Sequence, residues 1–208
     1  MASLLDTATQ RRYDEQFVAI RRLAAAVPAK ERYQLSIENV KTDGLFKCGG
    51  KSYLVRAVNT YERAGFRWPE LVLYCLQDGQ TSYLEWEKGD ELSIFVSLEK
   101  LSFAQVGIEG QEQLWKISED EEGSAHYRDR PYYYHEDSAV TFFRDSGRKG
   151  TPFHQYLFAS DDEETFISVE EWGDEDEGYE HNVILSGKLN PAAIEVISRG
   201  EDSGDGNG

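Results

Sequence analysis

The sequence predicts a mainly β protein of the α+β class. We expect two related antiparallel β units that form a barrel- or sandwich-like body, with one amphipathic N-terminal helix. Three observations lead to this prediction. Apolar residues follow a helical period only before Pro28, and they alternate with polar residues after it, as in strands. Glycine-containing turns separate the alternating segments. The order of aromatic and glycine residues in the first half recurs in the second.

The N-terminal helix is expected over residues 10–26. Its apolar residues are spaced by 4, 3, 4 and 3 positions and therefore share one helical face: Tyr13, Phe17, Ile20, Ala24 and Val27. Val27 precedes Pro28, which disfavours helical geometry and ends the helix. A helix this short is marginal in water on its own. We therefore expect Phe17 and Ile20 to pack on the β body or on a helix of a partner.

Short turns between the alternating segments predict antiparallel hairpins. Gly49-Gly50 lies between one pair of segments and Gln77-Asp78-Gly79 between another, and glycine tolerates the positive φ angles of tight turns. Residues 92–99 alternate between apolar and mainly polar side chains, which predicts a further strand. The tetrad Leu114 to Ile117 predicts a short strand, followed by an acidic loop over 119–123.

The second half of the chain repeats the order of the first. Tyr53 and Tyr132 each open a long strand, and each half then reaches a Glu-Trp pair followed by Gly-Asp-Glu. These pairs are Glu85-Trp86 and Glu171-Trp172, so we expect the two tryptophans at equivalent strand positions. The repeat predicts four segments: an N-terminal amphipathic helix within 1–30, a first β unit over 31–108, a second β unit over 109–199, and a disordered acidic tail over 200–208.

Composition restricts the location and the partners. The chain has 22 Lys and Arg against 39 Asp and Glu, and its net charge of −17 argues against a nucleic-acid partner, because phosphates are held by basic side chains. The longest apolar run, Leu71 to Leu76, is far shorter than the roughly 20 residues that span a bilayer. The N-terminal residues do not resemble a secretory signal. Cys48 and Cys75 are too few for a disulfide scaffold, which predicts a cytoplasmic protein.

The sequence predicts no catalytic residue, no metal site and no cofactor. Gly49-Gly50-Lys51-Ser52 resembles part of a phosphate-binding loop, but Gly44 stands one position too far away and strand-like residues follow instead of a helix. No Gly-x-Ser-x-Gly motif is present. The histidines lack the close spacing of a zinc site: His126, His135, His154 and His181.

An acidic run with interleaved aromatic residues is the strongest candidate for a binding surface. Residues 160–180 hold eleven acids and no Lys or Arg, and such density is costly because like charges repel. A cationic ligand would relieve the repulsion, and aromatic faces attract ammonium groups. A merely solvated face is the alternative. The candidate binding residues are Glu85, Trp86, Glu87, Glu170, Glu171, Trp172, Asp174, Asp176 and Tyr179.

Three segments of the first half resemble a bacterial and archaeal family, domain of unknown function 4178. They are the glycine-rich run over 43–55, the strand from Trp68 to Leu73, and Tyr83-Leu84-Glu85-Trp86. The resemblance extends over about residues 40 to 198 and implies a β-rich fold without an assigned activity. It also implies a shared pathway with phage-shock-type membrane-stress proteins, small membrane proteins and polyamine aminopropyltransferases.

These observations together predict a non-enzymatic interaction or adaptor module in a membrane-stress (phage-shock-like) or polyamine-linked system. Its expected partner is a basic protein or a polyamine, and a membrane-associated protein would recruit it without any membrane-spanning segment of its own. Two alternatives stay open. One is a polycation- or small-molecule-binding protein that uses the acidic, aromatic-lined face. The other, less favoured, is an enzyme with a carboxylate pair, for which Glu85 and Glu87 share one face of a strand.

Overall fold

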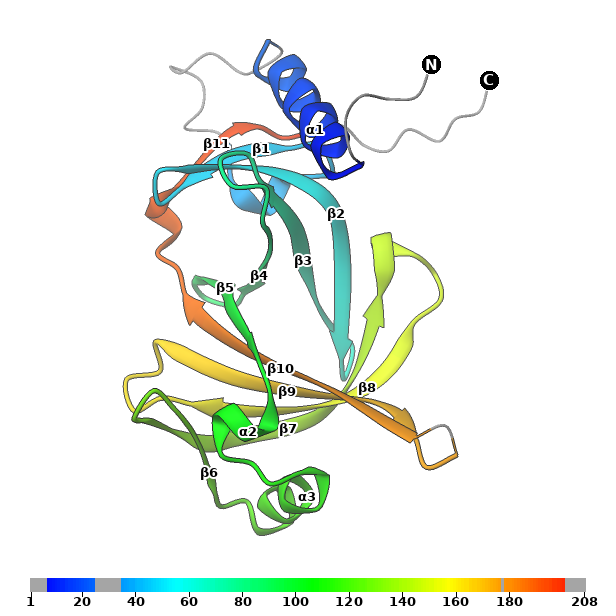
Figure 1. Cartoon of the computed structure of the whole chain (residues 1–208), viewed down its shortest axis with the longest axis vertical. Coiled ribbons are helices and arrows are strands. Elements are labelled where there is room, and N and C mark those ends of the chain that lie inside the picture. The colour runs from blue at the N-terminus through cyan, green and yellow to red at the C-terminus, as the bar shows by residue number, and fades with distance from the viewer. Residues whose placement is uncertain (1–6, 25–34, 177, 201–208) are drawn as a thin grey trace. The chain divides into compact units, whose positions relative to one another are not determined.

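The protein is mainly β. A computed structural model describes residues 7–24, 35–176 and 178–200 (Figure 1). In these residues, eleven strands belong to one antiparallel sheet, and strand residues outnumber helical residues by more than two to one. One helix lies near the N-terminus. The predicted fold class is therefore confirmed, whereas the predicted tail over 201–208 lies outside the described residues.

The chain divides into two compact units, each discontinuous in sequence. The first unit comprises the described residues of Met1–Val58, Glu70–Trp86 and Asn190–Gly208, and the second comprises Asn59–Pro69 and Glu87–Leu189. Three strands, β2 to β4, pass from one unit into the other. The division of the chain into four segments, which was inferred from the sequence repeat, stays a prediction.

The first unit is built on strands in the order β11-β1-β2-β3-β4. Leu54 and Leu71 are fully buried in it, because alternate residues of these strands face the core. Gly49 and Gly50 adopt positive φ angles in the turn between β1 and β2, as the sequence predicted. The elements are α1 (Thr7–Ala24), η2 (Ile37–Asn39), β1 (Leu45–Cys48), β2 (Lys51–Arg63), β3 (Phe66–Cys75), β4 (Thr81–Lys88), η4 (Pro191–Ala193) and β11 (Ile194–Ser198).

Helix α1 begins three residues before the predicted start, and residues 25 and 26 of the prediction lie outside the described residues. It lies beside β1 and β11 (Figure 1). Among the residues of α1 whose side chains the structure describes, the buried ones are Ala19, which is small enough for close packing, and Glu15, which pairs with Arg56. Phe17 and Ile20 are each 62% exposed, so their predicted packing on the β body is wrong, and packing on a helix of a partner stays a prediction. No helix in the described ranges is long and apolar enough to cross a bilayer.

The second unit is built on strands in the order β5-β10-β9-β8-β7-β6. The end of β2 also pairs with the end of β7, with Tyr61 opposite Phe142. One core cluster includes Leu114, Phe158 and Ile167, and packs α3 on the sheet. The elements are β5 (Leu92–Leu101), α2 (Phe103–Val106), α3 (Gln111–Asp120), β6 (Ser124–Tyr127), β7 (Arg130–Phe143), η3 (Arg144–Ser146), β8 (Thr151–Ala159), β9 (Thr165–Asp174) and β10 (Gly178–Lys188).

Helix α3 replaces the short strand that the sequence predicted over Leu114 to Ile117, and that prediction is wrong. The two buried residues of the helix are Leu114 and Ile117, which are three positions apart and share a helical face. The surrounding Gln, Glu, Leu and Lys residues are good helix formers. An apolar tetrad is ambiguous between helix and strand, and here the flanking residues decide.

The two halves of the chain share a strand order and an ion pair at equivalent positions. The strands β1 to β5 and β6 to β10 each follow one another as hydrogen-bonded neighbours, and Trp86 and Trp172 both lie on the fourth strand of their series. In the first series, Lys51 at the start of β2 pairs with Asp78 in the β3–β4 turn at 2.9 Å. In the second, Arg130 at the start of β7 pairs with Asp162 in the β8–β9 turn at 2.5 Å.

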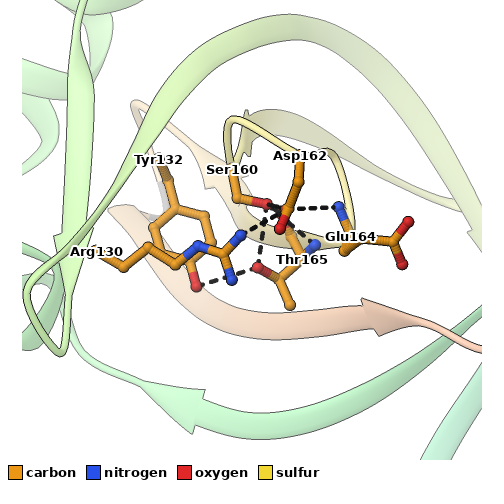
Figure 2. A network of polar contacts seen from close by, with 6 residues as sticks. All are labelled: Arg130, Tyr132, Ser160, Asp162, Glu164 and Thr165. Carbon is orange, nitrogen blue, oxygen red and sulfur yellow. Dashed lines mark hydrogen bonds and ion pairs between the residues drawn. The ribbon is translucent and has the colours of Figure 1, made fainter.

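Both aspartates also fix their own turns. Asp78 accepts the backbone N–H of Gln80 at 3.0 Å, and Asp162 accepts that of Glu164 at 3.1 Å. Figure 2 shows Arg130, Ser160 and Glu164 converging on Asp162. The N–H of Glu164 and the Ser160 hydroxyl hold the pKa of Asp162 below its usual value, with Arg130 adding to the effect. We call each of these ion pairs between a strand start and a turn a tether. Because both halves of the chain have such a tether, the structure supports the prediction of two related β units.

Candidate functional site

Glu171 in β9 is the predicted site residue with the most complete set of contacts. Its side chain is buried, at 7% exposure. Two donors come from α3, one from β8 and one from β10, so the carboxylate joins the helix to three neighbouring strands. The four groups are Gln111 Nε2 at 3.0 Å, Trp115 Nε1 at 3.1 Å, Tyr156 Oη at 3.4 Å and His181 Nε2 at 3.0 Å. These bonds compensate for the burial of the carboxylate.

Asp137 in β7 is a second attachment point for α3. It accepts hydrogen bonds from Ser118 Oγ of the helix and from Tyr134 Oη at 2.7 Å, and His154 Nε2 lies 2.8 Å away. Burial acts to raise the pKa of Asp137, but these hydrogen bonds outweigh it, and the pKa is lowered. Burial and the bond to Asp137 raise the pKa of Tyr134 to about 12.

Strand register places the two carboxylate–histidine pairs on one face of the sheet. His154 lies opposite Glu171, and Glu171 lies opposite His181. Residues opposite one another on antiparallel strands share a face, so the three side chains form a row across β8, β9 and β10. Among the described residues, no group of three His, Cys, Asp or Glu side chains could hold a metal ion. The row joins strands and helix through hydrogen bonds.

An acid–aromatic patch lies beside Glu171, where β9 ends and β10 begins; we define it as Trp115, Asp174, Glu175 and Tyr179. Trp115 is 38% exposed and meets the Tyr179 ring edge-on, with centroids 5.7 Å apart. Burial raises the pKa of Tyr179, and the negative charges of Glu175, Glu171 and Asp174 raise it further. Three carboxylates therefore act on Tyr179, and one of them, Glu171, also accepts the indole N–H of Trp115.

The structure separates the other predicted site residues from this patch. Glu170 points to the opposite face from Glu171, since neighbours in a strand alternate. It accepts a hydrogen bond from Trp172 Nε1 at 3.1 Å, and Trp172 stacks on Phe153 with centroids 4.3 Å apart. The backbone N–H of Asp176 donates to Asp174 at 3.0 Å.

The remaining three predicted residues lie on β4. Glu85 and Trp86 belong to the first unit, where Trp86 is buried and Glu85 lies opposite Glu70 of β3. Glu87 belongs to the second unit. Burial raises the pKa of Glu87, Arg63 acts to lower it, and the charge of Glu136 raises it further. These residues are therefore not part of the acid–aromatic patch.

The eleven acids of 160–180 do not form one continuous face. Glu170 and Glu171 are buried within β9. The exposed acids of 161–164 precede β9 and those of 174–176 begin at its last residue, and a ten-residue strand measures about 30 Å. Repulsion between the two turns is therefore screened at physiological salt, where charges act over about 8 Å.

Sequence reasoning missed most of the groups that contact Glu171 and Asp137. Gln111, Trp115 and Ser118 are spaced by four and three positions, so a helical assignment of 111–120 would have placed them on one face. Tyr134 lies three residues before Asp137 on the same strand. The partners on other strands had no local signal, because only the strand register brings them to Glu171 and Asp137: His154, Tyr156 and His181.

Comparison with protein families shows the family of this chain. Residues 41–184 match the model of the family described as Domain of unknown function (DUF4178), which is more than half of the chain. The chain belongs to this family. The DUF4178 region contains the acid–aromatic patch together with Asp137 and Glu171, whereas α1 and β11 lie outside it. Searches of the curated proteins and of the solved structures return no match.

The contacts of Asp137 predict a pH dependence of stability in this DUF4178 chain. We expect Asp137→Asn to be less stable than the parent at pH 7, with the difference shrinking as pH falls below about 4. The folded-state pKa of Asp137 is lowered, so its ionised form adds stability above the unfolded value, and this stability is lost as pH falls through the folded value. Urea unfolding at several pH values measures the difference. The exposed change Asp161→Asn is the control, and a pH-independent difference for Asp137→Asn would contradict the prediction.

Proposed function

We propose that this protein is a non-enzymatic interaction module that binds a basic segment of a partner protein through the acid–aromatic patch. The observation that carries the proposal is the pairing of Trp115 with Tyr179 beside Asp174 and Glu175. Lysine and arginine are attracted by aromatic ring faces and by carboxylates, and the patch offers both. Because Glu171 accepts the indole N–H of Trp115, the exposed part of that side chain is apolar ring.

The buried contacts favour binding over catalysis. Hydrogen bonds from Gln111, Trp115, Tyr156 and His181 occupy the oxygens of Glu171, and Glu170 points to the other face of the sheet. A general acid–base pair needs carboxyl groups that face one reacting centre. This arrangement therefore gives less support to an enzyme that would use Glu170 and Glu171 as its carboxylate pair.

A polyamine is the second candidate ligand. It carries the same ammonium chemistry as a basic segment, and the acids around Tyr179 favour such a ligand. We place the module in the cytoplasm, where the free thiols of Cys48 and Cys75 stay reduced. A membrane-stress (phage-shock-like) or polyamine-linked system, reached through a membrane-associated partner, is the proposed setting.

The test compares two variants with the same change in charge. Asp174→Asn/Glu175→Gln removes the two exposed acids of the patch, and Asp161→Asn/Glu163→Gln removes two exposed acids from the turn before β9. Calorimetric titration with an oligolysine peptide, and separately with spermidine, measures affinity at low and at physiological salt. We expect the patch variant to bind several-fold more weakly and the control to bind like the parent. Equal weakening of binding in both variants would contradict the proposal. The acids would then serve only to keep the protein soluble.

The aromatic part of the proposal needs its own variant. Tyr179→Ala removes the ring and leaves every carboxylate in place, so a loss of affinity of about threefold is expected from the cation–π contribution alone. Tyr133→Ala on β7 is the matched control, because that ring is 49% exposed and lies outside the patch. Unchanged affinity in Tyr179→Ala would show that binding depends on charge only.

A further inference from the structure

Helix α1 carries apolar residues on the side that points away from its own β unit. Phe17 and Ile20 are each 62% exposed, whereas Glu15 and Ala19 are buried. A helix turns by about 100° per residue, so Glu15 and Ala19, each two positions from Phe17, lie on roughly the opposite side of α1. Ala19 belongs to a core cluster with one residue of β1 and one of β11. In a single copy of the described chain, the apolar side of α1 therefore faces solvent.

The spacing of the apolar residues of α1 is the same in both directions along the helix. The stripe consists of Tyr13, Phe17, Ile20 and Ala24, spaced by 4, 3 and 4 positions within α1. When two helices pack antiparallel about a twofold axis, residues at equal distances from the axis lie opposite each other. With the axis at the middle of the stripe, Phe17 of one copy meets Ile20 of the other, and position 13 lies opposite position 24. The stripe is therefore complementary to a second copy of itself.

The charges beside the stripe match the same antiparallel arrangement. Asp14 and Arg21 are both exposed, and their spacing of seven positions places them on one flank of the stripe. In an antiparallel pair these flanks lie side by side. Arg21 of the second copy is then displaced from Asp14 by two residues, or about 3 Å of helix rise, which an arginine side chain can span. A parallel pair lacks this match, because each flank then lies beside the uncharged Thr9 and Gln16.

We propose that two copies of this chain form an antiparallel dimer through the apolar stripe of α1. Burial of Phe17 and Ile20 stabilises the dimer, and the two Asp14–Arg21 contacts determine the direction of the helices. A pair of short helices is a small interface, so dilution to low-micromolar concentration is expected to release the monomer, in which Phe17 is exposed. Helix α1 lies outside the residues that match the family model, so the interface is an addition to the DUF4178 region.

An anionic lipid surface is the main alternative cover for an exposed amphipathic helix. The charges oppose it, because Asp14 lies beside the stripe, the chain has a net charge of −17, and anionic headgroups repel acids. In the antiparallel dimer, the same acid instead lies next to Arg21 of the second copy. The charge pattern therefore favours a second copy over a membrane.

Sedimentation equilibrium of the full chain, from low-micromolar to submillimolar concentration, measures self-association. We expect a monomer–dimer equilibrium, and we expect Phe17→Ala/Ile20→Ala to raise its dissociation constant roughly tenfold or more. The control Phe66→Ala/Leu98→Ala shortens two apolar side chains elsewhere that are 44% and 56% exposed, and it is expected to dimerise like the parent. A parent that stays monomeric over the whole range, or equal weakening in both variants, would overturn the proposal.

Charge reversal tests the direction of the helices. Asp14→Arg and Arg21→Asp each place like charges at both contacts, so each variant is expected to self-associate several-fold more weakly than the parent. An equimolar mixture of the two variants restores opposite charges at both contacts and is expected to dimerise like the parent. Asp161→Arg makes the same change in charge as Asp14→Arg at an exposed site elsewhere and is expected to have no effect. A mixture that associates no more tightly than the separate variants would overturn the proposal.

Vesicles of an anionic phospholipid distinguish the membrane from the dimer. We expect the parent and Phe17→Ala/Ile20→Ala to float equally little with such vesicles. Flotation of the parent that the double variant loses would overturn the proposal, because the stripe would then bind lipid. Oligolysine titration measures the acid–aromatic patch independently, so a failure of the dimer and a failure of the proposed function are distinguishable.

Discussion

Replacing Glu171 with alanine is expected to lower the free energy of unfolding by about 3–5 kcal/mol. The change removes the acceptor of four buried or half-buried polar groups and leaves a cavity between α3 and the sheet. Each polar group left without a partner costs about 1–3 kcal/mol when it is buried. Urea unfolding at pH 7, followed by circular dichroism, measures the loss.

Two further changes make this result interpretable. Glu171→Gln keeps one carbonyl acceptor of similar size and is expected to cost less than the alanine. Glu175→Gln changes an exposed acid of the neighbouring turn and is expected to stay within about 0.5 kcal/mol of the parent. If Glu171→Ala unfolds at the same urea concentration as Glu175→Gln, the hydrogen bonds of Gln111 and Trp115 to Glu171 do not hold α3 on the sheet.

Replacing Phe158 with alanine is expected to cost about 3–5 kcal/mol. Phe158 has no exposed surface, belongs to the main core cluster of the second unit and meets Tyr134 edge-on at 6.1 Å. The expected loss combines the transfer of the ring into water with the cavity that remains. Thermal and urea unfolding of parent and variant measure it.

Phe17→Ala is the control, because it makes the same chemical change at a residue that is 62% exposed. We expect a change within about 0.5 kcal/mol. A loss as large as that of Phe158→Ala would contradict this prediction and show that Phe17 is covered in solution.

The sequence was sufficient for the fold class because strand and helix periods leave different patterns. The alternation after Pro28 and the glycine turns are local signals, and local signals can be recognised without knowledge of the tertiary structure. The orientation of α1 was not predictable in this way. The stripe with Phe17 and Ile20 indicated the apolar face, but the pairing of Glu15 with Arg56 directs another face toward the strands.

The candidate site was predictable only in part, because it depends on register. Glu171, Asp174 and Tyr179 were identified from charge and aromatic content, and they do lie near one another. The same reasoning grouped Glu170 with Glu171, although adjacent strand residues face opposite sides. His154 and His181 lie beside Glu171 only because β8 and β10 align with β9 in this register. A shift of both strands by one residue would place other residues opposite Glu171.

The paired tethers have a consequence for how the sheet finds its alignment during folding. Exposed ion pairs such as Lys51 with Asp78 and Arg130 with Asp162 contribute at most about 1 kcal/mol. Each nevertheless joins the first residue of a long strand to the turn that follows the neighbouring strand, so only one alignment of these two strands allows it to form. A strand that slips by one position loses the tether and turns its apolar side chains toward water. Each tether thus favours the correct hairpin register over a slipped one, and it restricts the flexibility of the chain only a little.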